Sequence, residues 1–373
     1  TTGGLGPTYD DLTKQTLARA FDRKLYLNED ALADIREYFA ERGRSFTDNN
    51  LQQAYLPEGS IMLPNDCGTA PGCIIEDGLV RVVMLSGPPR ECVTMLRNYV
   101  MPYLQKLSGG LIRSHMIRFF GIGESAMETR LRSFMDGANP TVAPYSREGE
   151  CWVRVTAKGA SAQECEALME PVIEDICDKM GDLVYGIDCA SLEERVLQLL
   201  QEKNTSLAVA ESCTGGMLSQ RITAVPGASG VFAYGACTYA NDIKEKMLGV
   251  RHETLEAYGA VSPETAAEMA RGVRKAAGAD FGVGITGIAG PGGGTPEKPV
   301  GLVYLAACSA DTVYVQKLVI TGRTREVVRL SSTQHALEMV RRLALGLPQP
   351  ACTAFPAEER AHLMQKGTPA RDV

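Results

Sequence analysis

The feature that most constrains this sequence is a short apolar run that ends in a glycine-containing turn. Residues 207–210 (Leu-Ala-Val-Ala) are typical of a buried strand, and a turn at 211–216 leads from it into a helix that begins at Met217. A strand, a tight turn and a helix in succession are the repeating unit of sheets that carry layers of helices. The run therefore predicts an α/β layered domain around it.

The segments around this run continue the alternation. Helices are predicted at 192–202 and 263–277, the second with Pro263 at its first position, where a proline fits best. Further strands are predicted at 231–239, 281–286, 301–307 and 312–320, before a long final helix. We therefore expect residues 190–346 to form one layered α/β domain.

The chain has 373 residues, more than a single core usually spans, so further domains are expected. Residues 1–106 have an α/β pattern, and residues 107–187 are typical of a small α+β module. Residues 347–373 combine prolines with polar residues and are predicted to be a flexible tail. The chain starts in a glycine-rich turn that normally follows a strand, so we expect the first domain to be incomplete.

The composition excludes several classes of protein. The net charge is −7, and phosphate backbones require clustered Lys and Arg, so no nucleic-acid partner is expected. Eleven cysteines without a Cys-x-x-Cys pair, and only four histidines, argue against a disulfide framework and a structural zinc site. Many free thiols are typical of the cytoplasm, and no apolar run is long enough to span a membrane.

Ser212 is the sharpest candidate for chemistry. It lies between a strand end and a helix start, where unpaired backbone N–H groups can hold an oxyanion if the serine attacks a carbonyl. The same position suits a residue that only caps the helix, and Ser212 or Thr214 fits that role as well. The local sequence leaves both interpretations open.

A serine nucleophile needs a base, and none of the histidines stands in a distinctive context. A buried lysine can lose its proton near neutral pH and take that role. Lys244 follows the strand at 231–239 in the first turn of a helix, whereas Lys246 faces elsewhere. Two solvated lysines remain the alternative interpretation.

Two glycine-rich segments are candidate binding loops. Residues 284–294 form a strand that ends in a flexible loop, typical of ligand-binding edges in α/β folds, although a long hairpin loop has the same pattern. Residues 2–13 combine glycines with Asp10 and Asp11, which suits a phosphate with a divalent metal. The alternative is that both aspartates are acids at a helix start.

Together these strings resemble the CinA family over essentially the whole chain. Ala-Glu-Ser-Cys-Thr-Gly-Gly at 210–216, Tyr-x-Asn-x-x-Lys from Tyr239 and Thr-Gly-Ile-Ala-Gly-Pro at 286–291 are similar to the C-terminal CinA domain, known as a nicotinamide-nucleotide amidase. Thr-Gly-Gly-Leu-Gly-Pro at 2–7 and Gly-Thr-Ala-Pro-Gly at 68–72 resemble the N-terminal CinA domain, which is similar in fold to molybdopterin-binding proteins.

The resemblance implies a fold for each part. Residues 1–106 would be a molybdopterin-binding-like α/β domain, 107–187 a KH-like α+β connector, and 190–346 a three-layer α/β/α domain. It also implies a cytoplasmic homodimer whose small-molecule substrate is a nucleotide. The reaction would convert nicotinamide mononucleotide to nicotinate mononucleotide and ammonia, a step of pyridine nucleotide (NAD) salvage, without a cofactor.

The resemblance also assigns roles to single residues. Ser212 would be the nucleophile and Lys244 the general base, with Tyr239 assisting. Backbone N–H groups around Thr214 and Gly215 would form the oxyanion hole. The other residues that it places at the oxyanion hole or the substrate are Gly216, Asn241, Thr286, Gly287, Ala289, Gly290 and Arg325.

Two other functions fit the same resemblance. One is a metal-dependent ADP-ribose pyrophosphatase, in which Asp10 and Asp11 of the first domain would bind a divalent cation. The other is a non-catalytic protein linked to competence or recombination. Metal dependence and the effect of replacing Asp10 or Asp11 would separate the first from an amidase, and the absence of turnover would indicate the second.

Overall fold

The computed structural model describes residues 1–107, 109–147, 149–349 and 352–356. The chain divides into two compact units. The first holds Thr1–Leu111 and Gly159–Ala162, and the second holds Ile112–Lys158 and the described residues from Gln163 onward. Within the described ranges, no helix combines the length and the apolar character needed to cross a membrane.

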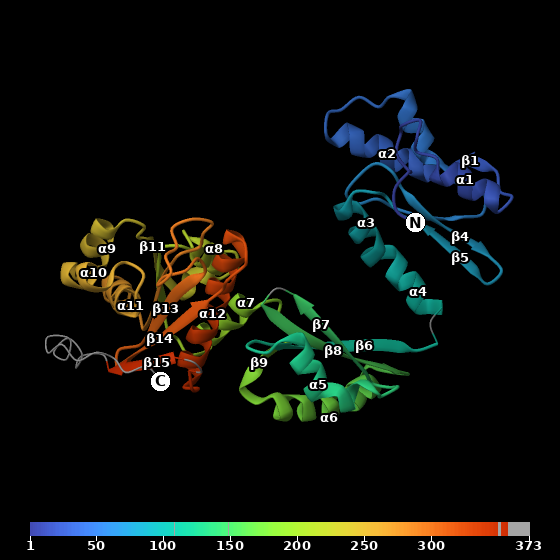
Figure 1. The fold of residues 1–373 in the computed structure, drawn as a ribbon. Coiled ribbons are helices and arrows are strands. Elements are labelled where there is room, and N and C mark those ends of the chain that lie inside the picture. The colour runs from blue at the N-terminus through green and yellow to red at the C-terminus, as the bar shows by residue number, and fades with distance from the viewer. Residues whose placement is uncertain (108, 148, 350–351, 357–373) are drawn as a thin grey trace. The chain divides into compact units, whose positions relative to one another are not determined.

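The first unit combines α-helices with small antiparallel sheets (Figure 1). Strands β3, β4 and β5 form one sheet, strands β1 and β2 form another, and Leu5, Leu56 and Ile75 lie in the core beside them. Its helices are α1 (Thr13–Ala20), α2 (Glu29–Glu41), η1 (Asp48–Ala54), α3 (Pro89–Met95), η2 (Leu96–Val100) and α4 (Met101–Leu107). Its strands are β1 (Leu25–Leu27), β2 (Tyr55–Pro57), β3 (Ile61–Leu63), β4 (Gly72–Asp77) and β5 (Val80–Met84).

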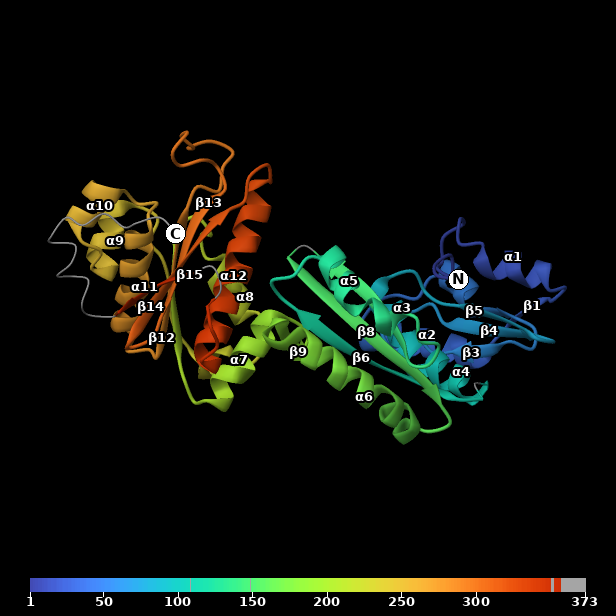
Figure 2. The same cartoon turned by 60° about the horizontal axis from the view of Figure 1, so that its bottom comes forward.

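The middle part of the chain forms a four-stranded sheet with two long helices, in the strand order β7-β8-β6-β9. Alternate residues of β8, among them Val153 and Val155, are fully buried, because strand side chains alternate between faces and α5 and α6 pack on one face (Figure 2). The elements are β6 (Leu111–Phe119), α5 (Glu124–Met135), β7 (Thr141–Arg147), β8 (Glu150–Gly159), α6 (Ala162–Met180), η3 (Gly181–Leu183) and β9 (Val184–Ile187).

The C-terminal part is a three-layer α/β/α fold, as expected (Figure 1). Helices α9, α10 and α11 lie on one side of a six-stranded sheet, and α7, α8 and α12 lie on the other. The helices are α7 (Leu192–Glu202), α8 (Met217–Thr223), η4 (Ala228–Gly230), α9 (Asn241–Leu248), α10 (His252–Tyr258), α11 (Pro263–Ala277) and α12 (Arg325–Leu345). The strands are β10 (Leu207–Glu211), β11 (Phe232–Cys237), β12 (Phe281–Gly287), β13 (Leu302–Cys308), β14 (Thr312–Val319) and β15 (Cys352–Pro356).

The strand order β11-β10-β12-β13-β14-β15 decides where the predicted motifs meet. Strand β10 pairs in parallel with both β11 and β12, whereas the other neighbours are antiparallel. The carboxyl ends of three parallel strands lie at one edge of the sheet, so the segments that follow β10, β11 and β12 converge there.

One hydrophobic core joins the middle part to the C-terminal part. Phe120 and Tyr185 are buried in the same cluster as Leu192 and Leu337. The ring of Phe120 meets His335 edge-on, with 5.1 Å between the ring centroids. The guanidinium of Arg341 donates hydrogen bonds to the carbonyls of Asp182 (2.7 Å) and Val184 (3.3 Å). These contacts make the two parts one packed unit.

The segment expected to be a flexible tail contains a strand. Strand β15 pairs antiparallel with β14, with Val315 opposite Thr353, and forms an edge of the six-stranded sheet. The prolines at 348, 350 and 356 dominate the sequence pattern here, and they mask the short strand between them. Residues 350–351 and 357–373 of the expected tail lie outside the described residues.

His115 links β6 to two acidic side chains of the same unit. Its Nδ1 lies 2.5 Å from an Asp188 carboxylate oxygen, and its Nε2 lies 2.7 Å from one of Glu166. The hydrogen bond to Asp188 raises the pKa of His115 above its ordinary 6.5, partial burial opposes this, and the hydrogen bond to Glu166 raises it further. Protonated His115 therefore ties α6 and residue 188 to the sheet.

The first prediction concerns the pH dependence of this link. A histidine whose pKa is raised by folding contributes stability that is fully present below its unfolded pKa of about 6.5 and is lost as pH rises through the folded value. We expect His115→Gln to lower the melting temperature of the second unit at acidic pH and to matter progressively less at higher pH. Thermal unfolding followed by the fluorescence of Trp152, the only tryptophan, reports this unit.

His252→Gln is the matched control, because His252 also meets two glutamates but its side chain is 64% exposed, where solvent screens ion pairs. Its effect should be small at every pH. A His115→Gln effect that grows as the pH rises would contradict the assignment.

Candidate active site

Three segments meet at the carboxyl edge of the parallel strands. The backbone N–H of Ser212, directly after β10, donates to the Ile285 carbonyl of β12 (2.9 Å). The N–H of Thr238, directly after β11, donates to the Glu211 carbonyl (2.9 Å). These two hydrogen bonds extend the pairing of β10 with β11 and with β12 by one bond each. They hold Ser212 between the ends of β11 and β12.

Lys244 is buried beside Ser212. Its side chain comes from the first turn of α9, is 1% exposed, and places Nζ 3.4 Å from Ser212 Oγ. The same Nζ donates to the carbonyls of Thr238 (2.9 Å) and Tyr239 (3.1 Å). The structure therefore brings together the serine and the lysine that the sequence singles out, and the interpretation of Lys244 as a solvated lysine is wrong. Lys246 is exposed, as expected.

The surroundings of Lys244 favour its neutral form. Burial lowers the pKa of Lys244 below its ordinary 10.5, although Cys213 opposes the shift. In the described part of the chain, no ion pair to a carboxylate is recorded for it. A neutral amine has two hydrogens for the two carbonyls and one lone pair for the Ser212 hydroxyl, which is the arrangement that a general base requires.

Cys213, next to Ser212, is not suited to be the nucleophile. Its side chain is 5% exposed, and burial raises the pKa of its thiol to about 12. Because the thiolate is the reactive form of cysteine, this thiol is inert near neutral pH. Ser212 is the better candidate.

The Glu211 side chain stabilises the turn at 211–216. Its carboxylate is fully buried and accepts hydrogen bonds from the N–H groups of Gly216 (3.1 Å), Leu218 (3.0 Å) and Ser219 (2.8 Å) and from the Ser219 hydroxyl (2.8 Å). These N–H groups lie at the start of α8, where backbone N–H groups have no acceptor within the helix. The helix is therefore capped by the Glu211 side chain. The Thr214 carbonyl accepts a hydrogen bond from the Met217 N–H (3.2 Å), but within the described residues neither the Ser212 nor the Thr214 hydroxyl caps the helix.

The expected oxyanion hole needs revision. The N–H of Gly215 donates to the Ser212 carbonyl (3.1 Å), and that of Gly216 donates to Glu211, so neither is open to a ligand here. Both glycines have positive φ, 57° and 90°, so they serve the backbone turn itself. Within the described residues, no backbone carbonyl accepts from the N–H of Cys213 or Thr214, which leaves these two as the candidate donors.

Two arginines of α12 hold the surrounding loops. Arg329 donates through Nε (3.1 Å) and Nη2 (2.6 Å) to the carbonyl of Thr214, and Arg325 donates through Nη1 to the carbonyl of Gly290 (2.8 Å). The two are four residues apart, so they lie on the same face of the helix. The start of α12 therefore ties the Ser212 turn and the glycine loop together.

The other predicted residues have varied surroundings. Thr286 is buried, and its hydroxyl donates to the Ala260 carbonyl (2.6 Å). Gly287 ends β12, Ala289 is buried after it, and Asn241 is exposed at the start of α9. Tyr239 contributes its carbonyl to Lys244, but its side chain is 65% exposed and no contact to Ser212 is recorded for its phenol.

Asp10 and Asp11 are engaged within their own turn. Asp10 accepts a hydrogen bond from the Thr8 hydroxyl (2.6 Å), and Asp11 accepts from the Thr8 N–H (2.9 Å) and hydroxyl (2.5 Å). Burial alone would raise the pKa of Asp11, but the hydrogen bonds from Thr8 lower it below its ordinary value. Among the described residues, no group of three or more His, Cys, Asp or Glu side chains is placed to hold a metal. The metal role of these aspartates stays a prediction.

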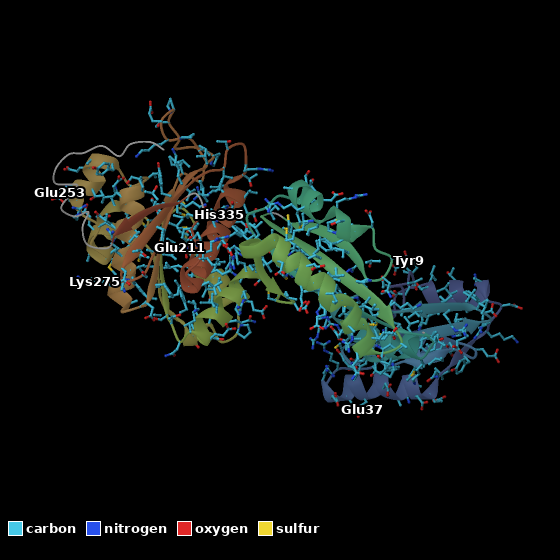
Figure 3. All side chains as sticks on the ribbon, turned by 90° about the horizontal axis from the view of Figure 1, so that it is seen from below. Tyr9, Glu37, Glu211, Glu253, Lys275 and His335 are labelled. Carbon is cyan, nitrogen blue, oxygen red and sulfur yellow. The ribbon has the colours of Figure 1, made fainter. Side chains whose placement is uncertain are left out.

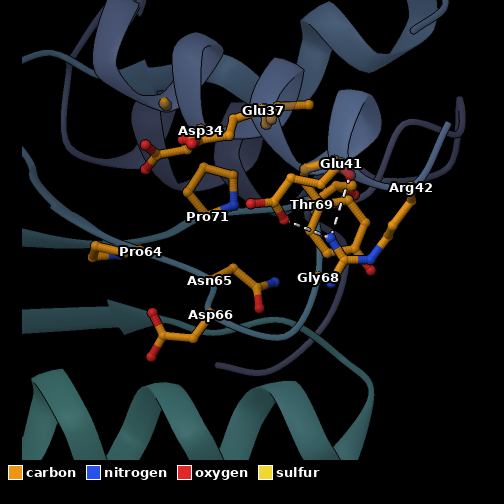
Figure 4. A pocket seen from close by; sticks show the side chains of 13 residues that line it. Asp34, Glu37, Glu41, Arg42, Pro64, Asn65, Asp66, Gly68, Thr69 and Pro71 are labelled. Atoms are coloured by element: carbon orange, nitrogen blue, oxygen red, sulfur yellow. Dashed lines mark hydrogen bonds and ion pairs between the residues drawn. The ribbon is translucent and has the colours of Figure 1, made fainter. Parts of the chain in front are cut away.

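A cavity of about 430 Å³ in the first unit lies between α2 and the loop at 64–71 (Figure 4). Asp34, Glu37 and Asp66 line it, together with Thr69 of the predicted Gly-Thr-Ala-Pro-Gly string. Neither Asp10 nor Asp11 is among its lining residues. Asp10 and Asp11 and the Gly-Thr-Ala-Pro-Gly string are therefore not assembled together around this cavity.

Comparison with known proteins finds a match for each of the three parts of the chain. The family model described as the CinA C-terminal domain matches residues 189–344. The model of the damage-inducible protein CinA KH domain matches residues 114–186, and that of the probable molybdopterin binding domain matches residues 1–106.

Individual relatives agree with these matches. A CinA-like protein from Desulfovibrio desulfuricans is 51% identical over 351 residues, which cover 93% of this chain and 82% of that protein. A competence-damage inducible protein from Thermoanaerobacter sp. is 48% identical over 347 residues, 93% of this chain and 84% of that protein. The crystal structure of competence/damage inducible protein CihA from Agrobacterium tumefaciens is 42% identical and covers 42% of this chain and 93% of its own, with a TM-score of 0.40.

The second prediction concerns Glu211, which the sequence analysis did not single out. Glu211→Gln keeps the shape of the side chain but replaces one carboxylate oxygen, which accepts hydrogen bonds, with an NH₂ group. That NH₂ group would then face N–H donors. We expect the free energy of unfolding of the second unit to fall by about 2–3 kcal/mol, the scale of hydrogen bonds to a buried charge. Urea unfolding followed by Trp152 fluorescence measures it.

Glu253→Gln is the matched control, because Glu253 lies exposed in the first turn of α10, at the margin of the same fold (Figure 3). Its effect should stay within about 0.5 kcal/mol, as for surface substitutions. Equal stability of the two variants would show that the Glu211 carboxylate does not hold the turn.

Proposed function

This chain belongs to the CinA family, and we propose that its C-terminal part is an amidohydrolase that converts nicotinamide mononucleotide to nicotinate mononucleotide and ammonia. The observation that carries the proposal is the buried Lys244 amine, which lies 3.4 Å from Ser212 Oγ and is held by two carbonyls. Such a pair suits nucleophilic attack on a carboxamide.

In the proposed reaction, Ser212 Oγ bonds to the carboxamide carbon while its proton passes to Lys244. Collapse of the tetrahedral intermediate breaks the C–N bond, and Lys244 returns the proton to the leaving nitrogen, which departs as ammonia. The acyl group is then an ester of Ser212. Water attacks this ester and loses a proton to Lys244, and the proton returns to Ser212 Oγ as the carboxylate product leaves.

The donors that would stabilise the developing oxyanion come from the same turn. The N–H groups of Cys213 and Thr214 follow the nucleophile, and in the described structure no backbone carbonyl accepts from them. The hydroxyl oxygens of Thr214 and Thr238 are buried and unpartnered there. A buried polar group without a partner is costly, so a bound carboxamide would satisfy groups that the protein leaves open.

The phosphate of the substrate would lie toward the glycine loop. Arg325 is exposed and uses Nη1 to hold the Gly290 carbonyl, which leaves other donors of its guanidinium to face a ligand. The loop residues 292–294 are exposed glycines and would allow a phosphate to approach the backbone closely. Arginine suits this role because its planar fork binds phosphate through two hydrogen bonds.

The third prediction concerns the nucleophile and its base. Ser212→Ala and Lys244→Met should each lower the rate of ammonia release from nicotinamide mononucleotide by roughly 10³-fold or more. The double variant should be little slower than either single one, because the two side chains act as one unit. Single-turnover measurements on the full chain give these rates.

Lys246→Met is the matched control: the same change, two residues along the same helix, at an exposed position. It should leave the rate nearly unchanged. Damage from Lys246→Met equal to that from Lys244→Met, or additive effects of the Ser212 and Lys244 substitutions, would reject the pair.

The fourth prediction follows from the lowered pKa of Lys244. Only the neutral amine accepts the Ser212 proton, so the rate should rise with pH as Lys244 loses its proton. The apparent pKa of this limb should lie below the ordinary 10.5. A rate that falls over that pH range would assign the base to another group.

The fifth prediction concerns metals. The proposed mechanism stabilises charge with backbone donors, so it needs no cation. Ammonia release by the full chain should therefore survive extensive treatment with EDTA. Loss of activity that added divalent cations restore would overturn the Ser–Lys mechanism.

A further inference from the structure

A second cavity lies within the second unit, lined by residues of both the middle and the C-terminal parts. It has a volume of about 550 Å³, within the range of roughly 300–1,000 Å³ that is typical of small-molecule sites. Strands β6, β7 and β8 contribute to it from one part, and α7, α8 and α12 from the other. We call it the Trp152 cavity. Its lining includes Arg118, Arg147, Glu150, Trp152, Met217 and Leu330.

The Trp152 cavity is separate from the proposed amidase site. Neither Ser212 nor Lys244 lines it, and the glycine loop and Arg325 do not line it either. Its walls are fixed, because the two parts share the core around Phe120. The Trp152 ring is stacked on Tyr145, with an interplanar angle of 6° and 6.1 Å between centroids. A ligand would therefore meet a preformed surface.

The charges around the cavity favour an anion. Three arginines and two glutamates line it, but the glutamates are largely committed. Glu193 pairs with Arg221 (2.9 Å), and Glu150 accepts from the Tyr185 hydroxyl (3.1 Å) and lies 4.0 Å from Arg118. No hydrogen bond or ion pair is recorded, among the described residues, for the exposed guanidinium of Arg147. One positive charge is left in excess.

The apolar part of the cavity lining indicates which kind of anionic ligand fits. Met217 and Leu330 offer apolar contacts, and the edge of the Trp152 indole adds aromatic surface. A phosphate monoester carries between one and two negative charges near neutral pH and has oxygens enough for two guanidinium groups, whereas a carboxylate carries one. A planar ring attached to the phosphate would fill the apolar part.

We propose that the Trp152 cavity binds a small phosphate monoester that carries a planar ring, with Arg147 and Arg118 on the phosphate and the ring against Met217 and Leu330. This site is additional to the proposed amidase site and does not depend on it. Its occupant need not be hydrolysed, because no nucleophile with a base lines the cavity among the described residues.

The test uses the fact that Trp152 is the only tryptophan of the chain. Adenosine monophosphate is titrated into the full chain, and selectively excited tryptophan fluorescence and titration calorimetry follow binding. We expect a saturable fluorescence change with adenosine monophosphate and none with adenosine, which lacks the phosphate. Arg147→Gln should weaken binding by about tenfold or more, the scale of a lost charge-assisted contact.

Arg130→Gln is the matched control, because Arg130 is an exposed arginine of α5 in the same part and does not line the cavity. It should bind adenosine monophosphate as tightly as the unchanged chain. The proposal is overturned if neither method detects saturable binding, if adenosine binds equally well, or if Arg147→Gln leaves the affinity unchanged. If adenosine monophosphate binds at the Ser212 site instead, Arg147→Gln leaves the affinity unchanged. This result is independent of whether the amidase proposal holds.

Discussion

Two buried ionisable side chains at the carboxyl edge of the sheet are stabilised in opposite ways, and the geometry around Ser212 depends on both. Glu211 accepts four hydrogen bonds, three of them from the start of α8, so its negative charge is matched by donors. Lys244 meets two carbonyls and a hydroxyl, with no recorded anionic partner in the described chain. The donors around Glu211 make it a structural anchor, whereas burial drives Lys244 toward the neutral, basic form.

The layered fold could be predicted because its elements have clear periodicity and clear ends. The apolar run before Glu211 and the proline at the start of α11 place a strand and a helix correctly. What the pattern could not give is association between elements far apart in sequence. Phe120 and His335 have no local signal that they will meet, and β15 is stabilised by pairing with β14 despite its flanking prolines.

The site shows the same division. Ser212 and Lys244 could be named as candidates from local context, because a turn after a strand and a first-turn lysine are recognisable in sequence, but local context left a helix cap and a solvated lysine open as alternatives. The expected oxyanion hole around Thr214 and Gly215 is revised at Gly215, because sequence cannot show that the turn itself already uses the N–H of Gly215 and that Glu211 uses that of Gly216. A glutamate at the end of an otherwise apolar strand was the available signal, since a fully buried carboxylate needs several donors close by.

The helices that hold Ser212 also form walls of the Trp152 cavity. On α12, Arg329 grips the Thr214 carbonyl, and the next residue, Leu330, lines the cavity. Directly before α8, Gly216 donates its N–H to Glu211, and the next residue, Met217, lines the cavity as well. The Trp152 cavity and the turn that holds Ser212 therefore share two helices as part of their surroundings. The middle part therefore belongs physically to the surroundings of the Ser212 turn, although its sequence pattern is typical of a separate module.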